Sequence, residues 1–289
     1  MAEPSVTTET YETLRPLAFS IAYRMLGSVA EAEDVVQEGL LRLHRAQAVE
    51  HPKAFVATVV TRLSIDELRS ARARRETYVG QWLPEPIVTD SRPDDESVTM
   101  ALLITLESLT PVERAVFLLH DVFDYGYDEI AEIVGKSREN CRQLALRARR
   151  HVEARRARFE ASREQRERLA GRFFEAIREG DLDGLVTLLA EDAEAIGDGG
   201  GKAAARATPL RGGAKVARFM LGLARLGERR AYTYEFTELN GEPGAVIRED
   251  GAVIGTMVIE VRGDEITAVR SVVNPDKLRH LSQGDRPLR

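Results

Sequence analysis

The stretch YDEIAEIVGKSRENCRQLALRARRHV, residues 127–152, decides how the rest of this sequence is interpreted. It predicts two short helices joined by a tight turn, because apolar residues recur at helical spacing on both sides of Gly135. Gly135 stands where a left-handed helix end is expected, and Ser137 suits the start of the second helix. The predicted apolar face of the second helix is Cys141, Leu144, Ala145, Ala148 and Val152.

The opposite face of the second helix is basic. It carries Arg138, Asn140, Arg142, Gln143, Arg147, Arg149 and Arg150. Residues 136–158 hold nine Lys or Arg and two Glu, a local charge of +7 in a chain of net charge −6. A basic helix after a glycine-containing turn is what a helix-turn-helix needs to enter the major groove and hold phosphates. We therefore predict contact with DNA; the alternative is a helical hairpin with a solvated basic face.

The composition limits the class of protein. A chain of 289 residues with 43% hydrophobic and 30% charged residues allows two or three globular domains. It has no apolar run of membrane-spanning length, and its first residues lack the order of a signal peptide, so no membrane contact is expected. A single cysteine rules out a disulfide within the chain and suits a cytoplasmic protein. The five histidines show no metal-ligand spacing, so we expect no metal. We also expect no cofactor.

Residues 9–76 are predicted to be all helical. The second of three expected helices, SVAEAEDVVQEGLLRLHRA, begins at Ser28 with an acidic first turn, which the helix dipole favours. It buries an apolar stripe and presents Asp34, Gln37, Glu38, Leu41 and Arg42. His51 and Pro52 interrupt the chain, and a third helix is expected from Lys53 to about Glu76.

Two quoted segments carry a family resemblance. EDVVQEGLLRLHR, followed by AFVATVVTRLSIDELRSARARRE, resembles the domain of bacterial RNA polymerase sigma factors that binds core polymerase and melts promoters. The short form without further N-terminal regions resembles the extracytoplasmic-function (ECF) group, and the helix-turn-helix corresponds to that group's second domain. A transcription repressor would explain the second domain and leave the first unexplained.

The resemblance implies partners and residue roles. The partners would be core RNA polymerase, docked on Asp34, Gln37, Glu38, Leu41 and Arg42, and promoter DNA. The segment with Arg62, Asp66 and Arg69 would face the minus-ten element. Arg138, Asn140, Arg142 and Gln143 would read the minus-thirty-five element, while Arg147 and Arg149 would hold phosphate. Since the whole chain is acidic, weak promoter binding is expected without polymerase.

Residues 77–96 are predicted to form an extended linker, because they hold three prolines and no sustained periodicity. Residues 85–96 carry five acidic residues and one Arg, a charge that would suit a basic channel of the polymerase. The string WLPEP, with Trp82, Leu83 and Pro84, is unusual for a loop, because a lone tryptophan tends to dock on another surface. It resembles an ECF subgroup with an extra C-terminal domain.

The last third is predicted to be that extra domain. Helical spacing gives way to alternating runs from residue 232 onward, with hairpin turns at 249–251 and 262–264. Helices followed by a curved antiparallel sheet indicate an α+β cone, which resembles the SnoaL-like domain fused to that subgroup. The expected boundaries are therefore 1–76, 77–96, 97–158 and 159–289.

The strings DGGGK and NPDKL stand out in this domain. By resemblance these strings, together with WLPEP, would be contact or switch segments of an intramolecular regulatory contact, through Asp198, Gly199, Gly200, Gly201, Lys202, Asn274, Pro275, Asp276, Lys277 and Leu278. The glycine string is not a phosphate-binding loop, since Ile196 and Ala203 occupy positions that require Gly and Ser or Thr.

Two alternatives stay open for this domain. Relatives of the fold include enzymes with an Asp base, but Asp198 is expected in a glycine loop with no accompanying His-Asp pair. The fold can also enclose a small-molecule ligand. We favour a non-enzymatic ECF-type sigma factor with an in-cis regulatory domain over a SnoaL-like enzyme or ligand sensor tethered to a DNA-binding domain. A ligand-responsive repressor, which would bind an operator without polymerase, is a third interpretation.

Overall fold

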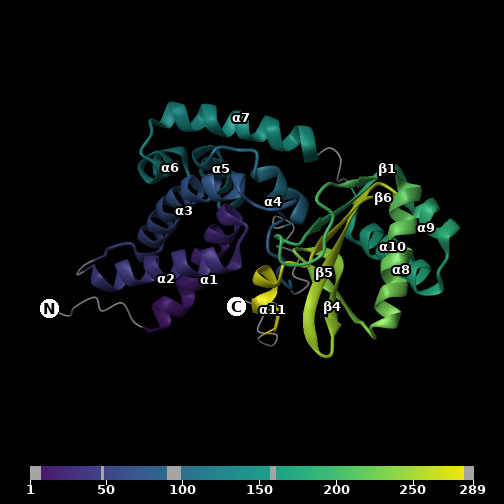
Figure 1. Cartoon of the computed structure of the whole chain (residues 1–289). Coiled ribbons are helices and arrows are strands. Elements are labelled where there is room, and N and C mark those ends of the chain that lie inside the picture. The colour runs from purple at the N-terminus through teal and green to yellow at the C-terminus, as the bar shows by residue number, and fades with distance from the viewer. Residues whose placement is uncertain (1–7, 47–48, 90–98, 157–160, 283–289) are drawn as a thin grey trace. The chain divides into compact units, whose positions relative to one another are not determined.

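A computed structural model of the chain describes residues 8–46, 49–89, 99–156 and 161–282. It forms two compact units, one from Met1–Glu76 and Thr105–Ala154, the other from Thr77–Ile104 and Arg155–Pro287 (Figure 1). Each unit therefore combines segments that are distant in sequence. Within the described ranges, no helix is both long and apolar enough to cross a bilayer.

The first unit begins with three packed helices, α1 (Thr8–Leu26), α2 (Val29–Arg45) and α3 (Pro52–Glu76). The Ser28 hydroxyl accepts a hydrogen bond from the backbone N–H of Glu31 and so caps α2 as the sequence predicts. The core between the helices is aliphatic; its fully buried members include Ile21, Leu26, Leu43, Val56 and Val60.

A second group of helices completes this unit. Its elements are α5 (Pro111–Phe117), the π-helical turn η2 (Leu118–Val122), α6 (Tyr127–Val134) and α7 (Arg138–Arg156). The helix that precedes them, α4 (Met100–Leu106), lies mostly in the second unit. Arg114 joins the two groups of helices, because its buried guanidinium donates to the backbone carbonyls of Leu106 and Met25 and pairs with Glu107 at 2.8 Å. The three partners compensate the buried guanidinium for the hydration that it loses.

The second unit is an α+β fold. Its elements are α8 (Arg163–Glu179), α9 (Leu182–Leu188), β1 (Leu189–Asp198), β2 (Leu210–Arg211), α10 (Gly213–Arg229), β3 (Thr233–Leu239), β4 (Glu242–Glu249), β5 (Ala252–Arg262), β6 (Glu265–Val272), the 3-10 turn η3 (Pro275–Leu278) and α11 (Arg279–Ser282). The strand order is β2-β1-β6-β5-β4-β3, and α8, α9 and α10 cover one face of the curved sheet (Figure 1). The apolar core lies between these helices and that face.

The predicted α+β cone is confirmed, with one correction to the sheet. The sheet is mixed, because β1 runs parallel to β6 while its other pairings are antiparallel. Parallel pairing needs a long crossover, here everything from β2 to β5, and local turn signals do not reveal it. The hairpin turns have the expected backbone, since Asp250, Gly251 and Gly263 have positive φ.

Candidate functional site

The helix-turn-helix has the geometry that its sequence predicts. Gly135 ends α6 in the left-handed conformation, with φ 66° and ψ 41°, and the Ser137 hydroxyl accepts from the N–H of Asn140. Cys141, Leu144 and Ala145 are buried against α6, in a cluster with Ile130 and Ile133. Burial raises the pKa of the Cys141 thiol, so this side chain acts as a small core residue.

The opposite face of α7 is free of the core. Its exposed side chains are Arg138, Asn140, Arg142, Gln143 and Arg147, while Arg149 is half-buried. Arg149 pairs with Asp121 at 2.6 Å, and this hydrogen bond raises the pKa of the Arg149 guanidinium. The N-terminal half of α7 therefore presents two arginines and two amides to solvent, the side chains that read base edges in a major groove.

Arg62 occupies a different environment from its neighbours on α3. Its guanidinium donates to the backbone carbonyls of Glu132, at 2.8 Å, and Ile133, at 2.9 Å, which lie at the C-terminal end of α6. Asp66 and Arg69 are exposed and pair with each other at 3.0 Å. The three residues assigned to the minus-ten element thus lie on one helix, with one of them bound to the helix-turn-helix.

The exposed face of α2 carries the five residues assigned to polymerase docking. Asp34, Gln37, Leu41 and Arg42 are exposed, and Glu38 is half-buried and pairs with Arg42 at 2.7 Å. Gln37 and Leu41 also line a hollow of about 410 Å³ between α1 and α2. An exposed leucine beside a hollow and mixed charges is a geometry that suits a protein partner.

In the second unit, Asp198 is the centre of a buried polar cluster that we call the linker anchor. The carboxylate is fully buried and lies at the end of β1, not in a glycine loop as expected, because β1 keeps pairing with β6 as far as Val272. One carboxylate oxygen accepts from the hydroxyl of Tyr78 at 2.6 Å. The other accepts from the backbone N–H of Leu83 at 2.8 Å and from the Lys277 ammonium at 2.7 Å.

Lys277 and Asn274, from the C-terminal segment of the chain, also bind the linker directly. The Lys277 ammonium donates to the carbonyl of Leu83 and lies over the Trp82 ring, 4.2 Å from its centroid. The Asn274 amide donates to the Tyr78 hydroxyl at 2.9 Å. Burial and the hydrogen bond to Asp198 raise the pKa of the Tyr78 phenol, so it remains a donor at neutral pH. Pro84 and Leu278 are buried nearby, and Pro275 is the exposed first residue of η3.

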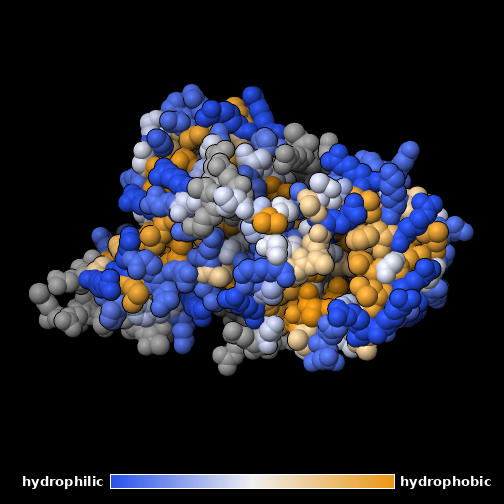
Figure 2. All heavy atoms as spheres, in the orientation of Figure 1, coloured by the Kyte–Doolittle hydropathy of each residue, from blue (hydrophilic) through white to orange (hydrophobic). Residues whose placement is uncertain are grey.

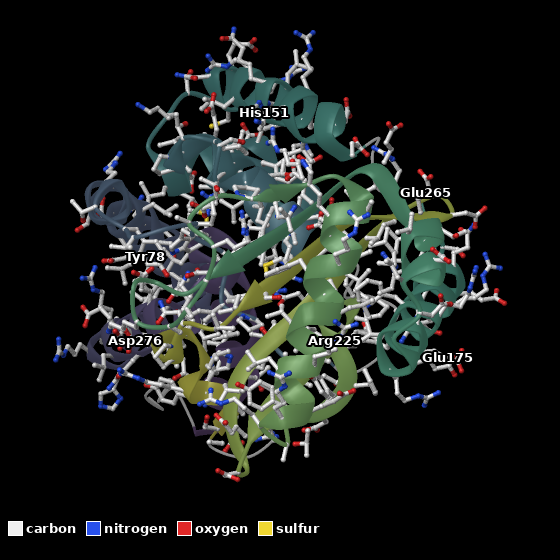
Figure 3. All side chains as sticks on the ribbon, turned by 45° about the vertical axis from the view of Figure 1, so that its right-hand side comes forward. Tyr78, His151, Glu175, Arg225, Glu265 and Asp276 are labelled. Carbon is white, nitrogen blue, oxygen red and sulfur yellow. The ribbon has the colours of Figure 1, made fainter. Side chains whose placement is uncertain are left out.

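The glycine string permits this close packing. A Cβ on Gly200 would lie 2.2 Å from the Asn274 amide nitrogen, and one on Gly199 would lie 2.3 Å from the carbonyl oxygen of Ala203. Gly201, which follows Gly200 in the same turn, has φ 71°. Lys202 pairs with Asp276, and this hydrogen bond lowers the pKa of the Asp276 carboxyl. Tyr78 and Asp276 lie on the same side of this unit (Figure 3).

The linker continues along the edge of the sheet beyond the anchor. Val88 forms a bridge with Leu239 on β3, and the N–H of Ile87 donates to the side-chain oxygen of the buried Asn240. The imidazole of His280 contacts the carbonyl of Pro86 at 2.6 Å. Residues 77–89 are therefore extended, as predicted, but they are bound to the α+β domain and form part of the second unit. Residues 90–96, which hold four of the five acidic residues of 85–96, lie outside the described ranges.

Three residues of this contact were missed in the sequence. Tyr78, Asn240 and His280 bind the linker or Asp198 directly, yet none belongs to the quoted strings. The only available signal was the pair Asn240-Gly241, a favoured hairpin turn, and it pointed to local structure.

A large cavity of about 1210 Å³ lies elsewhere in the second unit, between α8, α10 and the strands. Figure 2 shows hydrophobic residues gathered in a hollow over this part of the molecule. The described residues that line it do not include Asp198, whose two oxygens are engaged with the linker. Asp198 is thus not placed to act as a base on a molecule in the cavity.

Comparisons with known proteins agree with this arrangement. Residues 10–74 match the family model for sigma-70 region 2, and residues 99–152 match that for sigma-70, region 4. The ECF RNA polymerase sigma factor SigJ of Mycobacterium tuberculosis is 40% identical over 285 residues, 92% of this chain and 91% of that protein. The probable ECF sigma factor SigI of the same species is 30% identical over 298 residues, 97% of this chain and 98% of that protein.

The crystal structure of the M. tuberculosis extracytoplasmic function sigma factor SigJ has the same fold. It covers 98% of this chain and 100% of its own, with a TM-score of 0.78 and 35% identity. The two sigma regions, in order, and the α+β domain that follows them therefore have a full-length counterpart. This chain belongs to the extracytoplasmic-function family of RNA polymerase sigma factors.

Proposed function

We propose that three exposed surfaces of the first unit make the contacts with promoter DNA and with core polymerase. The basic face of α7 reads the minus-thirty-five element, α3 around Arg62, Asp66 and Arg69 meets the minus-ten element, and the exposed face of α2 docks on core polymerase. The observation that carries the DNA assignment is the N-terminal half of α7, whose arginines and amides are exposed while its apolar side is buried.

Promoter binding then requires the first unit to open. The two promoter elements are about 25 base pairs apart, roughly 85 Å at the 3.4 Å rise of one base step. Arg62 on α3 is in hydrogen-bond contact with Glu132 and Ile133 of the helix-turn-helix, so one compact unit cannot reach both elements. We infer that the described arrangement is the polymerase-free state.

The α+β domain is proposed to be an in-cis regulator that acts through the linker anchor. Supporting this role, residues 77–89 are held by Asp198, Asn274 and Lys277 instead of being free. A linker bound there cannot also lie in a basic channel of the polymerase. Release of the anchor is therefore expected to increase initiation.

Two finer aspects belong to the same proposal. The protein acts as a transcription factor without catalysis: Asp198, the candidate base, has both carboxylate oxygens engaged in the linker anchor. It works in the cytoplasm, where the polymerase is. The large cavity of the second unit supports a small molecule as a further partner.

The test is transcription in vitro with purified core polymerase and full-length variants. Lys277→Met removes the ammonium that holds Asp198, Leu83 and Trp82, and is expected to raise initiation several-fold. Lys215→Met, an exposed lysine on α10, is the matched control and should initiate like the parent chain. Equal initiation by the parent and Lys277→Met would reject the linker anchor as a regulatory contact.

A further inference from the structure

The walls of the large cavity are apolar and partly aromatic. Phe174 on α8, Phe219 on α10 and Phe236 on β3 line it, together with the buried Met220 and Met257. Phe174 and Phe236 approach each other with ring centroids 4.7 Å apart. The volume of about 1210 Å³ exceeds the range of about 300–1,000 Å³ that is usual for small-molecule sites.

The charged residues of the cavity lie at its rim and include both positive and negative side chains. Arg178 pairs with Glu175 at 3.4 Å, and Arg230 pairs with Glu249 at 3.3 Å. These groups are exposed or half-buried, whereas the deeper wall offers hydroxyls such as that of Ser271. A charged ligand would lose its hydration in this interior without gaining an ionic partner there. The chemistry fits an uncharged, mostly apolar molecule.

The cavity and the linker anchor share their supporting segments. Residues 195–197 line the cavity, and the next residue in β1 is Asp198. Residues 203–206 line it directly after the glycine turn, and Val273 lines it directly before Asn274. The N–H groups of Val273 and Asn274 both donate to the carbonyl of Asp198, at 2.8 and 3.0 Å.

The cavity and the anchor nevertheless face different ways. Glu175 at the rim lies on the opposite side of this unit from Tyr78 at the anchor (Figure 3). A molecule in the cavity thus touches the strand ends and the loop that hold the linker without touching the linker. A ligand packed against one side of such a loop reduces the motions that open its other side.

We propose that this cavity binds an uncharged, predominantly apolar small molecule with at least one ring, and that binding tightens the linker anchor. The regulatory part of this proposal rests on the proposed role of the linker anchor. With ligand bound, the α+β domain holds the linker more tightly.

The binding experiment uses full-length protein and N-phenyl-1-naphthylamine, an uncharged aromatic probe that fluoresces in apolar sites. We expect saturable binding that Leu223→Arg, at the cavity wall on α10, weakens at least about tenfold, since it places a charge among apolar groups. Val186→Arg on α9 is the matched control, because Val186 is 39% exposed, Leu223 is 37% exposed, and only Leu223 lines the cavity.

Three outcomes of this titration would overturn the cavity as a ligand site. They are no saturable binding, equal loss of binding in both variants, and an apparent affinity that falls as protein concentration rises. The last result would assign the hollow to a second copy of the chain.

The coupling experiment measures hydrogen exchange in full-length protein with and without saturating probe. The Leu83 amide, which donates to Asp198, is expected to exchange at least about threefold more slowly with probe, and Leu223→Arg should abolish this change. Unchanged or faster exchange at saturation would refute the coupling. Transcription by Lys277→Met tests the proposed role of the anchor separately, because it needs no ligand.

Discussion

The buried ion pair between Lys277 and Asp198 gives the most quantitative prediction. The two side chains are 7% and 0% exposed, and the pair also holds the linker through Leu83 and Trp82. Lys277→Met keeps an apolar stem of similar length and removes the ammonium. The Asp198 carboxylate then stays buried with two donors in place of three.

The magnitude follows from the contacts that are lost. Breaking a buried ion pair by removing one partner costs about 3–5 kcal/mol. The two remaining donors to Asp198, from Tyr78 and Leu83, place the cost near the lower end, while loss of the cation–π contact with Trp82 adds about 1 kcal/mol. We expect Lys277→Met to lower the free energy of unfolding of the second unit by about 3–4 kcal/mol.

The assay is urea denaturation followed by tryptophan fluorescence. Trp82 is the single tryptophan of the chain and lies in the second unit, so its signal reports unfolding of that unit. Lys202→Met is the control: its pair with Asp276 is largely exposed, and its loss should cost less than about 1 kcal/mol.

A double-mutant cycle with Asp198→Asn tests the assignment of this energy to the pair. The double variant should lose at least about 2 kcal/mol less than the sum of the single losses, because each single variant leaves a buried partner unmatched. Additive losses, or a loss below about 1 kcal/mol for Lys277→Met, would refute the reasoning.

Three further predictions concern other parts of the molecule. Gly200→Ala should destabilise the second unit by at least about 1 kcal/mol in urea denaturation, because its Cβ meets Asn274 and its φ is 56°, whereas Gly171→Ala, with open space around it, should not. Burial and Glu260 raise the pKa of Glu242 to about 8, so the folded unit keeps a proton that the unfolded chain loses near pH 4.5. Stability of the parent should therefore fall between pH 5 and 8, and Glu242→Gln should flatten this slope; parallel pH profiles would contradict the prediction. Arg142→Ala should weaken promoter binding by the polymerase holoenzyme by about 1–3 kcal/mol in a filter-binding titration, and a binding loss that is the same for promoters mutated at minus thirty-five would exclude a base-reading role.

The helix-turn-helix was predictable because its signals are local. Gly135 and Ser137 specify the turn by their own backbone and hydroxyl chemistry, and the apolar stripe through Cys141 needs only the helical period. The family resemblance extended this reasoning to the whole chain. The α+β class was predictable because the spacing of apolar residues changes from helical to alternating after the helices.

The remaining features depend on contacts between distant residues. Tyr78 reaches Asp198 across 120 positions, and Arg62 reaches Ile133 across 71, distances over which periodicity and turn chemistry carry no information. The parallel pairing of β1 and β6 was missed for the same reason. The assignments of single residues to promoter bases or to polymerase remain predictions.

The hydrogen bonds of Arg62 contribute to the free energy of opening the first unit as well as to its geometry. Each bond from a guanidinium to a backbone carbonyl contributes about 1.5 kcal/mol or more, so separating α3 from Glu132 and Ile133 costs about 3 kcal/mol from this residue alone. By itself, that cost lowers the equilibrium constant for opening about 150-fold, in addition to the contacts of Arg114. If core polymerase binds only the open form, these bonds make its apparent affinity for the sigma factor about 150-fold weaker than it would be without them. Arg62→Met would remove this penalty, and the sigma factor would compete more strongly for a limited pool of polymerase.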